Sequence, residues 1–158
     1  MVKGSCGESL ATIWIRTGKI EGVEYRIRQG VYGVMVNRED NSVAVLKTST
    51  GCFLPGGGVE GDETHEECLK RECIEEIGYE VRIGDFIGSA ERYFYSTTHH
   101  EYMVSDGYFF LVNVNKKLSV STEDDHELVW ISQSEIEESL FHEHQIWAVK
   151  QVISGMAG

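Results

Sequence analysis

The sequence predicts one domain with an α+β or α/β sandwich fold, and three observations indicate it. Segments rich in β-branched and aromatic residues stand both before and after one central helical pattern. Further helical periodicity lies near the end of the chain. A chain of 158 residues that is 41% hydrophobic can bury a core between such layers, so we expect a single domain over residues 1–158. Residues 1–20 are left open as a loosely attached N-terminal segment.

The first predicted strands form a hairpin. Residues 25–37 are rich in β-branched and aromatic side chains, and residues 43–47 form a second apolar run. Residues 38–42, between them, have the composition of a turn. Pro55 then precedes three glycines at 56–58, at which we expect neither helix nor strand to continue.

A helix over residues 65–77 has a signal at each end. Thr64 and Glu67 have the spacing of a capping box, in which each side chain bonds the other's backbone N–H. Gly78 suits the left-handed conformation that often follows the last helical turn. After this helix we expect strands at 81–95, 103–115 and 128–131, then helices at 134–140 and 144–153.

The charge of the chain restricts its partners. The formal net charge is −12, and residues 60–76 alone hold eight acids against two bases. Such a chain repels a nucleic-acid backbone, so we expect no stable nucleic-acid complex. A small phosphorylated ligand that arrives with a divalent cation is compatible with this charge.

The expected location is the cytoplasm. No window approaches the roughly 20 apolar residues of a membrane span, and no signal peptide precedes the first strand. The four cysteines form no C-x-x-C pair, which favours free thiols in a reducing compartment and disfavours a zinc site. A homodimer is one assembly left open by the sequence.

The central helix carries a cluster of like charges. Glu72, Glu75 and Glu76 fall within an arc of about 100° on a helix, beside a separate apolar stripe of Leu69, Cys73 and Ile77. Their mutual repulsion costs a few tenths of a kcal/mol per pair, which a cation offsets. Mg²⁺ prefers carboxylate and phosphate oxygens, so the cluster predicts a metal site. The planar fork of Arg71 is expected to hold a carboxylate of the preceding loop, Glu63 or Glu60.

Residues 57–79 resemble the signature of the Nudix hydrolases, the family that includes the MutT-type nucleotide pyrophosphohydrolases. The matching positions are Gly57, Glu63, Arg71, Glu72, Glu75, Glu76 and Gly78. Cys73 and Tyr79 stand where the family prefers bulky aliphatic side chains. The resemblance implies an α/β/α sandwich with a mixed β-sheet flanked by helices and a catalytic loop-helix-loop at 54–79.

The resemblance also implies an activity and a site. The activity is hydrolysis of a nucleoside diphosphate linked to another moiety, by water attack on phosphorus with Mg²⁺ or Mn²⁺. The implied metal ligands are Glu72, Glu75, Glu76 and the Gly56 carbonyl, while Glu63 and Arg71 orient the site. The general base is either Glu72 or an acid at 123–127, among which Glu127 is our candidate.

The substrate is less constrained than the reaction. A MutT-like role on nucleoside triphosphates is the favoured prediction, and the alternatives are a dinucleoside polyphosphate hydrolase and a non-catalytic Nudix domain that binds a nucleotide. Arg26, Arg28 and Tyr95 are the candidate substrate-binding residues, because they offer cations and a ring on predicted strands. The histidine pairs His99–His100 and His142/His144 are expected to be ordinary surface residues.

Overall fold

The computed structural model describes residues 16–17, 19–118 and 126–157. Its main sheet has the strand order β1-β6-β7-β2-β5, and a smaller antiparallel sheet has the order β4-β3-β8. The strands are β1 Arg16–Thr17, β2 Arg26–Val34, β3 Val43–Thr48, β4 Gly51–Phe53, β5 Gly56–Gly58, β6 Tyr79–Ser96, β7 Glu101–Lys117 and β8 Glu127–Ile131. The helices are α1 His65–Ile77, the short 3-10 helix η1 Gln133–Glu135, α2 Ile136–Ser139 and α3 Glu143–Ala157.

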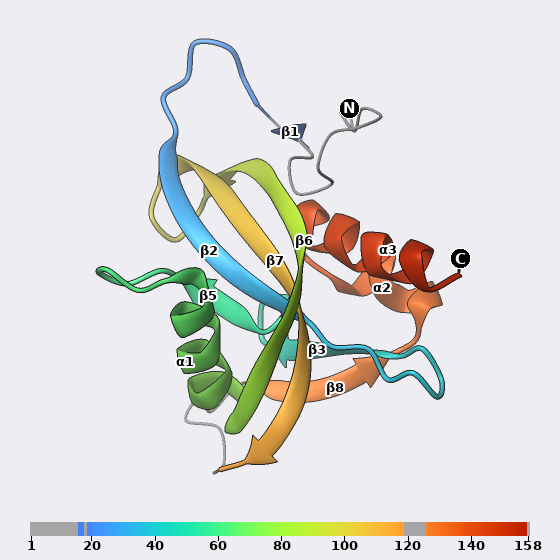
Figure 1. Ribbon diagram of the computed structural model, residues 1–158. Helices are drawn as coiled ribbons and strands as arrows, with labels where there is room; N and C mark the ends of the chain where they lie inside the picture. The colour runs from blue at the N-terminus through green and yellow to red at the C-terminus, as the bar shows by residue number, and fades with distance from the viewer. Residues whose placement is uncertain (1–15, 18, 119–125, 158) are drawn as a thin grey trace, which may run out of the picture.

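The main sheet is mixed and lies between helices (Figure 1). Strand β2 runs parallel to β7 and antiparallel to β5, while β6 and β7 form a long antiparallel pair. Helix α1 covers one face of this sheet, and α3 covers the other. The predicted α+β fold with a mixed sheet flanked by helices is confirmed.

The second half of strand β2, residues 30–34, is covered on both faces because a helix lies on each side of the sheet. Val31 and Met35 pack in the core that includes Leu69 of α1, whereas Val34 packs in the core that includes Trp147 of α3. Alternate residues of a strand point to opposite faces, which explains this division. A strand segment that is covered on both faces has no solvent-facing polar side.

Helix α1 begins and ends as predicted. The Thr64 hydroxyl accepts from the Glu67 N–H, and the Glu67 side chain accepts from the Thr64 N–H. Gly78 has a φ of 71° and donates its N–H to the last turn of the helix. Leu69 and Cys73 are completely buried, so the predicted apolar stripe is the face that packs on the sheet.

Three details of the predicted elements are wrong. Strands β2 and β3 are joined by a turn, but they form only one bridge, Val36 to Val43, and then enter different sheets. The glycines at 56–58 form strand β5 rather than an interruption, because they pair with residues 30–32 of β2. The predicted helix at 134–140 is divided into η1 and α2.

The prediction for residues 1–20 falls mostly outside the described residues. No helix among the described residues is long and apolar enough to cross a membrane.

Gly56→Ala is expected to lower the free energy of unfolding by about 3 kcal/mol. Gly56 has a φ of 144°, and an added Cβ would lie 2.1 Å from the Val31 carbonyl oxygen and 2.7 Å from the Tyr32 Cα. Backbone atoms cannot move aside as a flexible side chain does. Urea denaturation measures the change, with Gly155→Ala in α3 as the control, since a Cβ there meets nothing within 4 Å. Equal unfolding midpoints for Gly56→Ala and the wild type would contradict this account of β5.

Candidate functional site

The acidic face of α1 lies directly against strand β5. The Gly56 N–H donates to Glu76 Oε1 at 2.8 Å. A Cβ on Gly57 would lie 2.3 Å from Glu72 Oε2, so glycine is what permits this carboxylate to approach the strand. Strand β5 and the acidic face of α1, which a loop separates in the sequence, therefore form one site.

Arg71 organises the carboxylates around it. Its Nε and Nη2 donate to the two oxygens of Glu63, at 2.6 and 3.0 Å. Its Nη1 donates to Glu72 at 2.9 Å and to Glu75 at 3.2 Å, and Nη1 also lies 3.5 Å from a Glu60 oxygen. A guanidinium has five N–H donors in a rigid plane, which suits this fan of acceptors. The predicted pairing of Arg71 with the preceding loop is confirmed, for Glu63 and for Glu60.

The same hydrogen-bond network stabilises the loop that precedes α1. The Glu60 N–H donates to Glu63 Oε1 at 2.9 Å, and Arg71 Nη2 donates to the Gly58 carbonyl at 3.1 Å. Glu63 thus links the loop backbone to the helix through Arg71. Its hydrogen bonds to Arg71 lower the pKa of Glu63 to about 2.

The low pKa of Glu63 predicts how stability depends on pH. The folded state holds this proton less tightly than the unfolded chain does, so the stabilisation is complete above about pH 4.5 and is lost as the pH falls toward 2. Glu63→Gln should weaken this acid dependence, which urea denaturation at pH 6, 4 and 3 measures. Glu66→Gln, at an exposed position in the first turn of α1, is the matched control. An unchanged acid dependence in Glu63→Gln would refute the assigned role of this carboxylate.

Negative charge remains in excess on this face. Four carboxylates lie within 4 Å of Arg71, so one guanidinium cannot neutralise them. Burial raises the pKa of Glu72, in opposition to its bond with Arg71. The neighbouring thiols stay neutral and add no further negative charge, since burial raises the pKa of Cys68 to about 11 and that of Cys73 to about 12.

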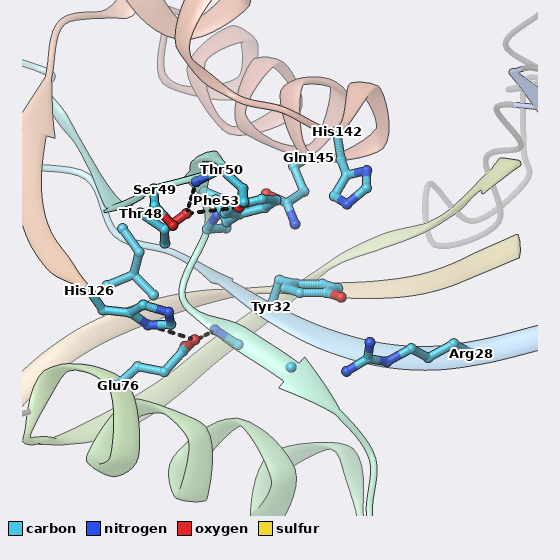
Figure 2. Close-up of a pocket in the computed structure, with 14 residues that line it drawn as sticks. Arg28, Tyr32, Thr48, Ser49, Thr50, Phe53, Glu76, His126, His142 and Gln145 are labelled. Atoms are coloured by element: carbon cyan, nitrogen blue, oxygen red, sulfur yellow. Dashed lines mark hydrogen bonds and ion pairs between the residues drawn. The ribbon is translucent and has the colours of Figure 1, made fainter. Parts of the chain in front are cut away.

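A cavity of about 430 Å³ opens beside this acidic face. Its size is within the range of pockets that bind small molecules. The lining residues are Arg28, Tyr32, Leu46, Thr48, Ser49, Thr50, Phe53, Leu54, Gly56, Gly57, Glu76, His126, His142 and Gln145. Figure 2 shows Glu76 and His126 at one end, Arg28 and His142 at the other, and Tyr32 between them.

Contacts between distant segments of the chain position the side chains of the cavity wall. His126, which directly precedes β8, places its Nδ1 3.7 Å from Glu76 Oε2. Between the two ends, Tyr32 is hydrogen-bonded to Ser105, whose hydroxyl lies 3.0 Å from His144 Nε2. The cavity is therefore walled by residues from β2, from the loops beside β4 and β8, and from the start of α3.

A second cavity, of about 460 Å³, is also lined by Arg28. It is bordered by Glu72, Glu60 and Gly58, together with residues 27–29 of β2. Arg28 lines both cavities, as the acidic face of α1 also does through Glu72 and Glu76.

Comparison with known proteins identifies the family. The model of the NUDIX domain matches residues 26–151, which is most of the chain and includes every element of the site. The chain belongs to the Nudix family. In Arabidopsis thaliana it is 32% identical to Nudix hydrolase 21, chloroplastic, over 94 residues, and 32% identical to Nudix hydrolase 4 over 122 residues. These alignments cover 59% and 73% of this chain, but only 46% and 55% of the two relatives, so the chain spans about half their length.

Solved structures share the Nudix fold. A NUDIX hydrolase from Nitrosomonas europaea superposes with a TM-score of 0.64 over 82% of this chain and 90% of its own, at 14% identity. At this level of identity the likeness concerns the fold. The predicted membership of the Nudix family, made from residues 57–79, is confirmed by the family match.

The donor set of this Nudix site suits a divalent cation by its chemistry. Glu72, Glu75 and Glu76 offer carboxylate oxygens from one helix face, and the Gly56 carbonyl belongs to the strand beside them. Hard oxygen donors with excess negative charge are what Mg²⁺ and Mn²⁺ bind. Among the described residues, no three metal-ligating side chains come close enough together to hold an ion as they stand, and Arg71 Nη1 donates to both Glu72 and Glu75.

The predicted substrate-binding residues separate in space. Arg28 lines both cavities. Arg26 instead donates to Glu101 at 3.0 Å, and Tyr95 is 48% exposed with its ring against Tyr102. Neither Arg26 nor Tyr95 borders the two cavities described here, and their roles stay predictions.

The acids considered as alternative bases also differ in position. Glu127 is exposed at the start of β8, where it pairs in register with Lys47, and it lines neither cavity. Glu123 and Asp124 lie outside the described residues. Glu72 lines the second cavity.

Histidines are where the sequence-based interpretation is least accurate. His144 is fully buried and His142 lines the main cavity, so the expectation that both are surface residues is wrong. Both belong to a segment that folds against the sheet, which a pair of isolated histidines does not reveal. His126 was missed, although it stands within the acidic stretch at 123–127; no spacing rule links it to Glu76, fifty residues earlier.

Proposed function

We propose that this Nudix domain is a divalent-metal-dependent pyrophosphohydrolase, which cleaves a nucleoside diphosphate linked to another moiety by water attack on phosphorus. The observation that carries the proposal is the position of Glu76, which lines the cavity from a helix face rich in carboxylates. A phosphate chain bound there meets carboxylates only if cations intervene. Phosphoryl transfer depends chiefly on positioning and charge neutralisation, which such a site provides.

The residues of the chain have distinct tasks in this proposal. Glu72, Glu75 and Glu76, with the Gly56 carbonyl, would hold Mg²⁺ or Mn²⁺, which supplies charge neutralisation at the phosphate oxygens. Arg71 orients Glu72 and Glu75 through Nη1 and anchors the loop through Glu63. The Gly56 N–H holds Glu76 through Oε1, and His126 Nδ1 lies 3.7 Å from Oε2.

Glu72 is our candidate for the general base. It lines the second cavity beside Arg28, whereas Glu127 is exposed and lines neither cavity. A carboxylate that accepts a proton from water must lie within hydrogen-bond reach of that water in the bound complex. Glu72 would meet this requirement with a substrate that spans the two cavities, because it lines the second of them.

The favoured substrate is a nucleoside triphosphate, cleaved to a monophosphate and pyrophosphate. Phe53 and Tyr32 offer rings to a base, and the hydroxyls of residues 48–50 offer hydrogen bonds to it. A dinucleoside polyphosphate is the alternative substrate. The cytoplasm is the proposed location, in which the free thiols of Cys52, Cys68 and Cys73 stay reduced.

Chromatography of the products after incubation with Mg²⁺ tests the proposal. The panel contains canonical and oxidised nucleoside triphosphates, dinucleoside polyphosphates, nucleotide sugars and ADP-ribose. Release of a nucleoside monophosphate from one class, absent in a Glu75→Gln/Glu76→Gln double variant, supports it. If the folded protein hydrolyses none of these compounds, a binding role is favoured over an enzymatic one.

Mg²⁺ is expected to raise the melting temperature of the protein. Bound cation relieves repulsion among the α1 carboxylates, and the folded state alone assembles them. Differential scanning fluorimetry with 0 and about 10 mM MgCl₂, and with NaCl of equal ionic strength as the control, measures the shift; at a Kd of about 0.1 mM it corresponds to ~2.7 kcal/mol. The same shift with NaCl would show general screening rather than a site.

A further inference from the structure

The charges that line the main cavity are divided between its two ends. Among the described lining residues, Glu76 is the one carboxylate, and it lies at the end with His126. Arg28 and His142 lie at the other end, beyond Tyr32 (Figure 2). A ligand that fills the cavity therefore meets two different electrostatic environments.

Arg28 carries a charge that no nearby carboxylate of the described residues matches. Arg71 contacts four carboxylates and Arg26 contacts Glu101, but no carboxylate of the described residues lies within 4 Å of the Arg28 guanidinium. The chain has almost twice as many acids as bases, 26 against 14, so partners for an arginine are abundant. An arginine that lines two cavities without an ion pair is available to a ligand anion.

The wall next to Arg28 holds further nitrogen groups. His142 Nδ1 is buried and has no hydrogen-bond partner among the described residues, and the same is true of Arg92 Nε. Burial, together with Arg92 and Arg28, lowers the pKa of His142 to about 4, so its ring is neutral at pH 7 and can donate one N–H. An unsatisfied buried polar group costs stability, and a bound ligand that accepts its hydrogen bond removes this cost.

Two neighbouring side chains are held so that they present donors. Gln145 accepts from the Leu54 N–H through Oε1 at 2.8 Å, which leaves its amide nitrogen as the remaining polar group at the cavity. The Tyr32 hydroxyl is held by Ser105 beside this end. These contacts fix both groups before a ligand arrives.

We propose that Arg28, His142 and Gln145 form a subsite for a phosphate group of the ligand, separate from the carboxylate end where the pyrophosphate is cleaved. The inference rests on the proposed function and narrows its substrate class. The substrate carries a phosphate at the far end of the cavity, in addition to the phosphates that Glu76 meets through cations. A neutral base or sugar would leave the Arg28 charge unmatched, whereas a phosphate carries the opposite charge and can accept hydrogen bonds from guanidinium, imidazole and amide groups.

Binding of inorganic phosphate to the metal-free protein tests the subsite. The protein is kept in a chelator at pH 7 and constant ionic strength, and the imidazole signals of His142 are followed by NMR during the titration. A saturable shift is expected for the wild type at millimolar phosphate. The affinity should fall at least tenfold in Arg28→Gln and less in Arg28→Lys, which keeps the charge.

Arg82→Gln is the matched control, because Arg82 is exposed on β6 and lines neither cavity. It should bind phosphate as the wild type does. No saturable shift of His142 in the folded wild type, or equal affinity in Arg28→Gln, would overturn the proposal. The titration requires neither metal nor turnover. Its outcome therefore stays interpretable even if the substrate panel shows no hydrolysis, and the two proposals can fail separately.

Discussion

Glu76→Gln is expected to lower kcat by at least two orders of magnitude while the protein stays folded. The substitution keeps the size of the side chain and an acceptor for the Gly56 N–H, but it removes the negative charge that lines the cavity. Loss of a cation ligand at a phosphoryl-transfer site removes several kcal/mol of transition-state stabilisation. Steady-state kinetics on the substrate found in the panel measure the loss, and circular dichroism checks the fold.

Glu66→Gln is the control for this experiment. Glu66 lies on the same helix, but it is exposed and lines neither cavity. Its kcat should stay within about twofold of the wild type, since exposed substitutions away from a site change little. A wild-type kcat in Glu76→Gln at saturating Mg²⁺ would remove Glu76 from the metal site.

Arg71→Leu is expected to lower the free energy of unfolding by about 2–3 kcal/mol and to abolish turnover. The arginine side chain is 23% exposed, and the Glu63 and Glu72 side chains that it contacts are 19% and 14% exposed. Without it, these half-buried carboxylates face one another unpaired. The cost is smaller than for a fully buried pair because water still reaches the site.

Two further variants separate charge from geometry at this position. Arg71→Lys keeps the charge but has no planar fork, so it should recover less than half of the lost stability. Lys70→Leu removes a cation from an exposed neighbour and should change the free energy of unfolding by less than about 0.5 kcal/mol. If Arg71→Leu and Lys70→Leu are equally stable in urea, Arg71 does not organise the site.

The sequence predicts those parts of the molecule that depend on neighbours along the chain. The caps of α1, its buried stripe and its acidic face all follow from residue spacing over a few turns. The hydrogen bond between Arg71 and Glu63 was also predictable, because the two residues are eight positions apart and flank the start of α1. The central strands likewise follow from their apolar composition.

Contacts between distant segments were not predictable in the same way. The glycines at 56–58 form a strand only because β2 approaches them closely, as the short distance from Gly56 to the Val31 carbonyl shows. His126 reaches Glu76, and His142 reaches the cavity, because the sheet topology brings three separate loops together. Arg26 and Arg28 share one face of a strand by alternation, yet a salt bridge to Glu101 in β7 distinguishes Arg26 from Arg28.

Hydrolysis in water labelled with ¹⁸O tests the central claim most directly. The substrate identified in the panel is incubated with the protein and Mg²⁺ in this water, and the products are analysed by mass spectrometry. We predict one ¹⁸O atom in a single phosphate-bearing product, a rate that falls to background with chelator, and no labelled product from the Glu75→Gln/Glu76→Gln double variant. Unlabelled products, or labelling that persists in the double variant, would contradict water attack on phosphorus at the acidic face of α1.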